Sequence, residues 1–311
     1  MDYYAFGESL LDIIVSKNEQ AQTVAGGSQL NVAANLAIAG HKTQLISYIG
    51  EDAPGNIIHN FAKKAGIGTD FLHKDAQHKT AIAFAVLNEE GQASYSFYKD
   101  YPKTLFEGVA FPEFNADTCF SFGSMAALEN QWQPALEHLL LSAKSAGSLI
   151  FYDPNIRSKL KDKTAESRLL RNMQVASIIR GSDEDFFTIF ETTDPVIIAE
   201  KAGLHATQLL LITQGAKDVI AYFKKEKTSY PIPSLKPVST IGAGDAFNSG
   251  ILSFAEVLRL TAKNMHLLVD EIIGVFVGVG ISFAANVCKS TGNTISAEMA
   301  DSLRTIRDDL S

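Results

Sequence analysis

The sequence predicts an α/β fold: a doubly wound, mostly parallel central sheet with helices on both faces and a small antiparallel β lid. Short apolar runs that favour strands alternate with helical patterns along most of the chain. From Thr80 this rhythm breaks, because TAIAFAVLN and ASYSFYK follow each other with only a turn at residues 89–91 between them. The 311 residues are 46% hydrophobic and 20% charged, as in globular proteins. We expect one domain over residues 1–311, with a lid formed by about 12–24 and 80–100.

The first strand is expected at residues 3–6, where a short apolar pattern ends at Gly7. Glu8 and Asp12 follow its carboxyl end, the edge at which open α/β sheets bind ligands. Carboxylates there can accept hydrogen bonds from sugar hydroxyls, although solvated turn acids would show the same pattern.

The segment AGGSQLNVAANLAIAG predicts a helix with a stripe of small apolar residues that ends at Gly40. Gly26 and Gly27 form a flexible turn before it, and Asn31 lies in its first turn. The Asn31 amide offers donors and an acceptor to neighbouring sugar hydroxyls, but a helix-capping Asn would look the same. A strand at 44–49 and a helix at 56–65 follow.

Beyond the lid, the alternation of strands and helices resumes. The strand at 149–152 leads into DPNIR, where Arg157 is a candidate phosphate clamp because its planar fork pairs with two oxygens. The acidic residues in SDEDFF either belong to a functional site or only interact favourably with the dipole of the helix that begins there. Strands are further expected at 119–122, 177–179, 208–212 and 219–223, and helices at 133–146, 164–176, from SDEDFF, from GAGD, around Asn286 and at the end of the chain.

Gly242, Ala243, Gly244 and Asp245 stand between a β-favouring run and a helical pattern. A helix start offers free N–H groups and a positive dipole end, and glycines let an anion approach, so this turn suits phosphate. A carboxylate at this place would repel the phosphate unless it takes part in proton transfer. We expect Asp245 to take the proton of a hydroxyl that attacks a γ-phosphoryl group. The alternative is a plain helix cap, whereas Phe247 disfavours a dinucleotide-binding loop and hence a nicotinamide-dependent oxidoreductase.

The net charge of −8, without a basic block, makes nucleic acid and anionic membranes unexpected partners. Two cysteines and an N-terminus without a signal pattern indicate a cytoplasmic protein. The longest uncharged stretch, 272–288, has 17 residues and three glycines and predicts a buried helix. The seven histidines show no metal-ligand spacing, and His73 and His78 are expected on a solvated loop.

Seven segments in order, GESLLD, AGGSQLNVAANLAIAG, GEDAPG, DPNIR, TQG after a strand, TIGAGDAF and AANVCKSTG, resemble those of the PfkB-type, or ribokinase-like, carbohydrate kinases. The resemblance implies the ribokinase-like fold and ATP-dependent phosphorylation of a hydroxymethyl group on a sugar or nucleoside. It implies Asp245 as base, Gly242, Ala243 and Gly244 as anion hole, Asp12, Gly27 and Asn31 at the acceptor, Arg157 near the acceptor or phosphates, and Thr213, Gly215 and Asn286 at the nucleotide. DPNIR and GGSQLNVA look most like fructokinases.

Three elements depart from the family pattern. Ser239 replaces an acid that helps hold a monovalent cation, which leaves potassium activation open. The NxxE element is Ser182 and Asp185 here, so Mg²⁺ is expected on the ATP phosphates without a direct protein ligand, and a water-mediated contact with Asp185 stays open. Lys99 stands where fructokinases often carry a lid arginine near the acceptor, which weakens the fructose assignment.

The expected function is therefore transfer of the ATP γ-phosphate to a primary hydroxyl of a small sugar, with fructose favoured. Ribokinase, nucleoside kinase and 2-keto-3-deoxygluconate kinase activities are the alternatives within the family. A catalytically silent protein that binds sugar or nucleotide is the alternative outside enzymes, disfavoured by the intact GAGD. The free edges of the lid sheet are consistent with a homodimer.

Overall fold

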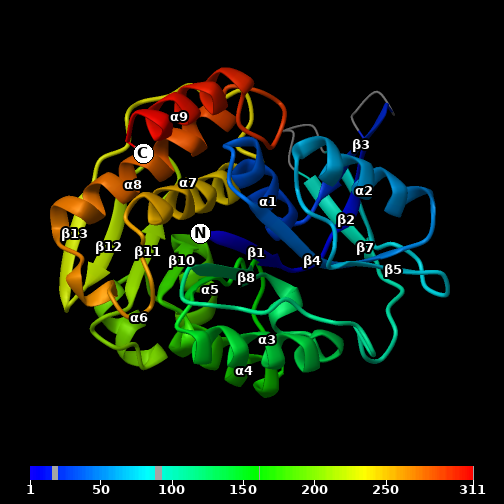
Figure 1. Ribbon diagram of the computed structural model, residues 1–311, viewed down its shortest axis with the longest axis horizontal. Helices are drawn as coiled ribbons and strands as arrows, with labels where there is room; N and C mark the ends of the chain where they lie inside the picture. The colour runs from blue at the N-terminus through cyan, green and yellow to red at the C-terminus, as the bar shows by residue number, and fades with distance from the viewer. Residues whose placement is uncertain (16–19, 88–92, 161, 311) are drawn as a thin grey trace.

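The computed structural model describes residues 1–15, 20–87, 93–160 and 162–310, and its centre is a nine-stranded sheet (Figure 1). The strand order is β13-β12-β11-β10-β9-β8-β1-β4-β5, parallel from β11 to β5 and antiparallel at β12 and β13. This confirms the predicted doubly wound, mostly parallel sheet. The strands are β1 (Asp2–Phe6), β4 (Thr43–Gly50), β5 (Leu72–Asp75), β8 (Thr118–Gly123), β9 (Leu149–Asp153), β10 (Ile178–Ser182), β11 (Leu209–Thr213), β12 (Val219–Phe223) and β13 (Glu226–Tyr230).

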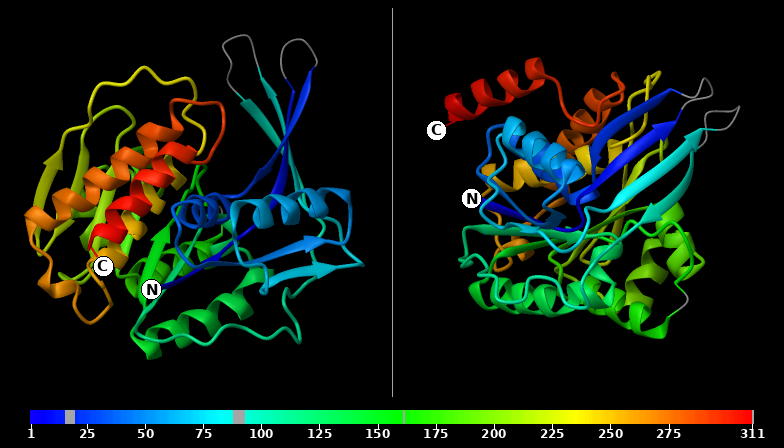
Figure 2. Two further views of the ribbon diagram at one scale, coloured as in Figure 1. Left: turned by 45° about the horizontal axis from the view of Figure 1, so that its top comes forward. Right: turned by 90° about the vertical axis from the view of Figure 1, so that its right-hand side faces the viewer.

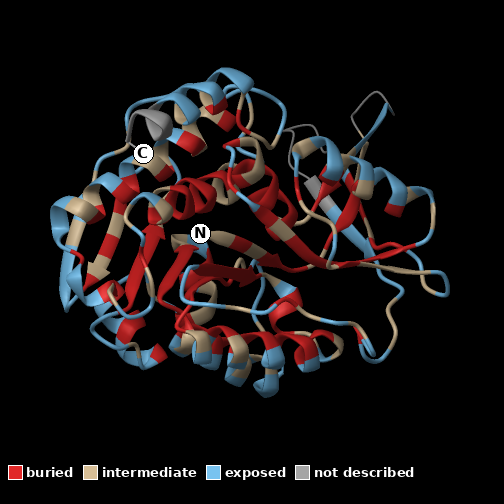
Figure 3. Cartoon of the chain, viewed as in Figure 1, coloured by how far each residue is buried: buried red, intermediate tan, exposed pale blue. Residues whose placement is uncertain are grey.

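Helices cover both faces of this sheet, because successive strand residues point to opposite sides. Leu210 and Ile212 belong to the core under α3, α4, α5 and α6, whereas Leu209 and Leu211 belong to the core under α7 and α8. The buried strands and the exposed outer faces of the helices are visible in Figure 3. The helices are α1 (Ser28–Ile38), α2 (Ala53–Ala65), α3 (Gln133–Ala146), α4 (Lys163–Val175), α5 (Asp183–Phe190), α6 (Pro195–Ala202), α7 (Ala243–Val257), α8 (Asp270–Val287) and α9 (Ala297–Leu310).

A second sheet of four strands projects from this body (Figure 2). Its order is β3-β2-β6-β7, with antiparallel outer pairs and a parallel central pair between β2 and β6. The predicted turn at 89–91 lies outside the described residues. We call this sheet the lid; its strands are β2 (Leu10–Val15), β3 (Ala21–Gly26), β6 (Ile82–Leu87) and β7 (Ala93–Tyr98).

The sequence did not predict β5, β13 or α6, and His73 lies on β5 rather than on a solvated loop. The strands β5 and β13 form the two edges of the large sheet. They carry charged residues, so they lack the apolar run that is typical of a buried strand. A tight turn with positive φ at Lys224 and Lys225 joins β12 to β13.

Helix α8 is the one described helix that is long and apolar enough to cross a membrane. One of its faces is buried against α7, where a Cβ added to Gly250 would lie 2.8 Å from the Gly280 Cα atom. The opposite face includes Val275, which is exposed, so the prediction of a buried helix holds for one face only.

Candidate active site

Helix α7 begins at a glycine turn that places Asp245 in its first turn. Gly242 is the N-cap residue with φ 77°, and a Cβ there would lie 2.8 Å from the Asn293 Cβ atom. Glycine is required for both reasons. Of the predicted anion-hole donors, the Ala243 N–H already donates to the Thr240 carbonyl at 3.2 Å. As at any helix start, the first N–H groups and the positive dipole end of α7 stabilise a nearby anion.

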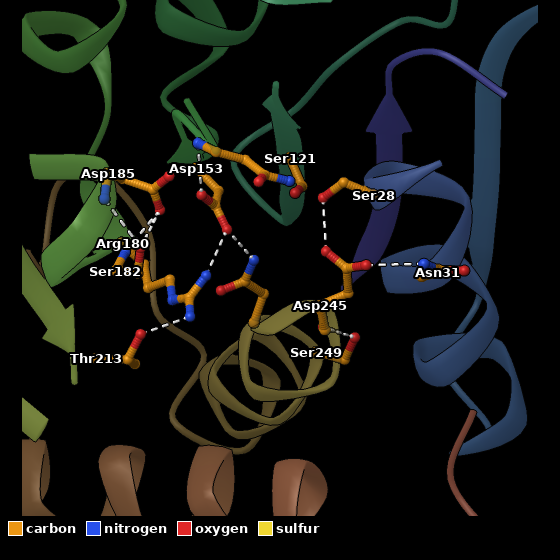
Figure 4. A network of polar contacts seen from close by, with 12 residues as sticks. Ser28, Asn31, Ser121, Asp153, Arg180, Ser182, Asp185, Thr213, Asp245 and Ser249 are labelled. Atoms are coloured by element: carbon orange, nitrogen blue, oxygen red, sulfur yellow. Dashed lines mark hydrogen bonds and ion pairs between the residues drawn. The ribbon is translucent and has the colours of Figure 1, made fainter. Parts of the chain in front are cut away.

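The Asp245 carboxylate is held by two donors from α1 (Figure 4). The Ser28 hydroxyl donates to Oδ1 at 2.7 Å, and the Asn31 amide donates to Oδ2 at 2.8 Å. Asp245 is therefore no N-cap, and the Asn31 side chain, buried in the same contact, is no cap of α1. Burial raises the pKa of Asp245 to about 6, while the bonds from Asn31 and Ser28 act in the lowering direction. A carboxylate that titrates near neutral pH is suited to general base catalysis.

The predicted acceptor residues lie where the lid joins the body. Gly27 precedes α1 with φ 120°, and a Cβ there would lie 2.2 Å from the Glu8 carbonyl oxygen. Asp12 lies on β2, with its Oδ2 atom only 2.0 Å from the position of a Cβ on Gly26. Burial raises the pKa of Asp12 to about 6, and the positive charge of Arg157 opposes that rise. The candidate site thus contains two carboxyl groups, Asp12 and Asp245, whose pKa values are raised to about 6.

Lys99 follows β7 and is bound by two carboxylates of the body. Its ammonium lies 2.9 Å from Glu8 Oε1 and 3.0 Å from Glu129 Oε1, and the Tyr101 hydroxyl donates to Glu8 at 2.7 Å. Glu8 is therefore not a solvated turn acid. The ion pairs tie the end of the lid strand to the body, so the structure gives Lys99 a role in fixing the lid besides the predicted contact with the acceptor.

Arg180 is a functional candidate that sequence reasoning missed. It lies on β10, is 8% exposed, and donates to Asp153 Oδ2 at 3.0 Å and to Thr213 Oγ1 at 2.6 Å (Figure 4). A Cβ on Gly244 would lie 3.0 Å from its Nη1 atom, so this guanidinium lies against the anion-hole turn. Arg157, the predicted clamp, is exposed. The signal that could have found Arg180 is a lone cation in a buried apolar strand.

Ser182 and Asp185 form a capping box at the start of α5. Each backbone N–H is bonded by the other side chain, and the Ser182 hydroxyl also donates to Asp185 Oδ2 at 2.7 Å. Burial raises the pKa of Asp185, and neighbouring Asp153 raises it further. Among the described residues no group of three or more His, Cys, Asp or Glu side chains could hold a metal ion.

The predicted nucleotide residues Thr213, Gly215 and Asn286 lie in two separate chain segments. Thr213 ends β11 and is bonded to Arg180, and Gly215 follows it in a turn with φ 61°. Asn286 lies in the last turn of α8, where its Oδ1 atom accepts from the Ser296 N–H at 2.8 Å. The loop before α9 is thereby fixed beside α8.

Comparison with known proteins identifies the family and the fold. The model of the pfkB family carbohydrate kinases matches residues 1–256. Fructokinase-2 of Oryza sativa subsp. japonica is 30% identical over 264 residues, covering 80% of this chain and 78% of that protein. Probable fructokinase-6, chloroplastic, of Arabidopsis thaliana is 29% identical over 280 residues, covering 86% and 71%.

Two solved structures have the same fold. The fructokinase from Xylella fastidiosa with bound ATP aligns with a TM-score of 0.83 at 22% identity and covers 99% of each chain. The aminoimidazole riboside kinase from Salmonella enterica, complexed with aminoimidazole riboside and an ATP analog, aligns with a TM-score of 0.83 at 19% identity over 100% of each chain. The predicted family and fold are confirmed, and the chain belongs to the pfkB family of carbohydrate kinases.

Proposed function

We propose that the protein transfers the γ-phosphate of ATP to a primary hydroxyl of fructose. The observation that carries this proposal is the Asp245 carboxylate, held at the start of α7 by two α1 donors and with a pKa raised to about 6. Relatives named fructokinase support fructose as the acceptor. Because an aminoimidazole riboside kinase aligns equally well, a nucleoside is the second candidate acceptor.

Each side chain has a role in this proposal. Asp12 and Asn31 hold acceptor hydroxyls beside the turn at Gly27, Lys99 and Arg157 lie near the acceptor, and Asp245 removes the proton from the attacking hydroxyl. The Gly242 and Gly244 amides and the α7 dipole stabilise the charge on the transferring phosphate, and the Ala243 amide adds to them by sharing its hydrogen with the Thr240 carbonyl. The part of the site that binds the nucleotide is formed by Ser182, Thr213, Gly215 and Asn286. The lid excludes water from the transferable phosphate.

ATP is proposed to bind with Mg²⁺, which would neutralise charge on its phosphates. Asp185 fits a contact with the metal's water shell, because its carboxylate lies at the carboxyl end of β10 and carboxylate oxygens suit this hard cation. Its bonds to Ser182 fix its orientation there.

The test is ADP release measured with Mg²⁺ and ATP against a panel of acceptors: fructose, ribose, aminoimidazole riboside, adenosine and 2-keto-3-deoxygluconate. We expect the highest kcat/KM with fructose. Higher turnover of a nucleoside would replace fructose as the acceptor. Saturable sugar binding without ADP release from any acceptor would instead identify a catalytically silent protein.

The pH dependence of turnover tests the base. Since Asp245 must be ionised to accept a proton and its pKa is about 6, we expect kcat to fall about tenfold per pH unit below that value. The folded state binds this proton more readily than the unfolded state, so acidification through pH 6 stabilises the fold at this group. The loss of turnover should therefore be reversible and precede any loss of circular dichroism. A kcat that stays level down to pH 4.5 would contradict the assignment.

We propose a cytoplasmic location, which is supported by two buried free cysteines, Cys119 and Cys288.

We also propose a homodimer that forms through the lid. The lid has an exposed aromatic face on its edge strand β7, where Tyr95 and Phe97 stack with ring centroids 6.0 Å apart. Phe97 is 58% exposed, as expected for a residue covered by a second subunit.

Phe97→Glu tests this dimer, because a charge on the stacked face would be buried in the interface. We expect analytical ultracentrifugation to show a dimer for the unmodified protein and a monomer for the variant. Leu141→Glu is the matched control, since Leu141 is 69% exposed on α3, a helix that covers the large sheet and is no part of the lid, and its substitution should leave the dimer intact. A monomeric unmodified protein would refute this interface.

A further inference from the structure

Asn293 reaches the catalytic base through one intervening side chain. It lies in the loop between α8 and α9, and its Nδ2 atom donates to Asn31 Oδ1 at 2.8 Å. Asn31 in turn donates its own Nδ2 hydrogen to Asp245 Oδ2 at 2.8 Å. Asn31 is 214 residues away from Asp245 in the sequence and 262 residues away from Asn293.

The direction of these bonds follows from the charge of Asp245. An ionised carboxylate only accepts hydrogen bonds, so Asn31 must turn its NH₂ group toward Asp245. Its carbonyl oxygen then faces Asn293, which must present an NH₂ group of its own. With Asn293 in place, the opposite orientation of the Asn31 amide would set two NH₂ groups against each other and an oxygen against the carboxylate.

The loop is held in place independently of the Asn293 side chain. Asn35, which is fully buried on α1, accepts the Ile295 N–H at 2.7 Å and donates to the Asn293 carbonyl oxygen at 3.3 Å. Both bonds join backbone atoms of the loop to α1. A substitution of the Asn293 side chain therefore removes its bond to Asn31 without releasing the loop.

We propose that Asn293 is a positioning residue that holds the Asn31 amide in the one orientation that donates to Asp245. This proposal rests on the proposed role of Asp245 as base. The charged groups that act on Asp245 are Asp153 and Arg180, which face it from β9 and β10 and are bonded to each other. Asn293 thereby connects the loop that follows the nucleotide-side helix α8 to the acceptor side of the site.

Asn293→Asp should reverse the Asn31 amide. The new carboxylate offers no hydrogen to Asn31 Oδ1 and competes for the Asn31 NH₂ group, so Asp245 loses a donor and gains a carbonyl oxygen as its neighbour. The pKa of Asp245 then rises. We expect the acid limb of kcat to move up by about one pH unit, the size expected from losing a hydrogen bond to a charged group. Asn293→Ala frees the amide without reversing it and should move the limb less.

Two controls separate orientation from simple charge. Thr291→Asp adds the same charge to an exposed position of the same loop and should leave the acid limb in place. In an Asn31→Ala background, Asn293→Asp should shift the limb no further, because the intermediary is gone. An unshifted Asn293→Asp profile, or a shift that persists without the Asn31 amide, would overturn the proposal. Failure of the proposed base is a different result: Asp245→Asn would then retain turnover.

Discussion

Asp245→Asn is expected to lower kcat by about 10²–10⁴-fold, the usual contribution of general base catalysis. The amide has the shape of the carboxylate but cannot take the proton of the attacking hydroxyl. Its single oxygen can still accept from Ser28 or from Asn31, while its NH₂ group meets the other donor. We therefore expect fructose and ADP affinities, measured by calorimetry, to change only a few-fold while turnover is lost.

The same variant should not unfold the protein. Because burial raises the pKa of Asp245, ionisation of this group costs more free energy in the folded state than in the unfolded state, and a neutral amide removes that cost. Glu298→Gln is the matched control, an exposed acid in the first turn of α9, and should keep full activity. Turnover within tenfold of the unmodified enzyme would show that another group takes the proton.

Local patterns were sufficient to predict the buried part of the fold. The strands β1, β4, β8, β9 and β11 are apolar runs with turn residues at their ends, and α7 follows directly from the glycine turn and its apolar spacing. Edge strands β5 and β13 lack that signal, because all their side chains except Leu72 are half-buried or exposed, and both strands pair with a neighbour on one side.

The candidate site was predictable only as separate pieces. GAGD indicated a base at a helix start, but Ser28, its partner 217 positions away, has no local feature that marks it. The same holds for Asn293, whose meaning depends on the distant Asn31. The sequence indicates Arg157 because it follows a strand, whereas the structure exposes Arg157 and buries Arg180, on β10, against the start of α7. Spacing along the chain carries no information on such contacts.

Arg180→Met should be the most destabilising of these substitutions. Asp153 is 1% exposed, and its charge is balanced by Arg180; the Asn248 amide at 2.6 Å and the Asn155 N–H at 3.1 Å remain as neutral donors. Removing one partner of a buried ion pair leaves an uncompensated charge and typically costs about 3–5 kcal/mol. We expect the free energy of unfolding, measured with urea, to fall by about this amount.

The double variant Arg180→Met with Asp153→Asn distinguishes the buried charge from lost packing. It removes both charges, so most of the lost stability should return. A double variant that is as unstable as Arg180→Met would instead assign the loss to packing against Phe247. The ring centroid of Phe247 lies 5.7 Å from the guanidinium carbon of Arg180. Arg171→Met is the matched control, because its ion pair with Glu137 is exposed and such pairs contribute about 0–1 kcal/mol. If Arg180→Met costs no more than this control, water reaches Asp153, and the anion-hole turn lies against a hydrated cation rather than a buried one.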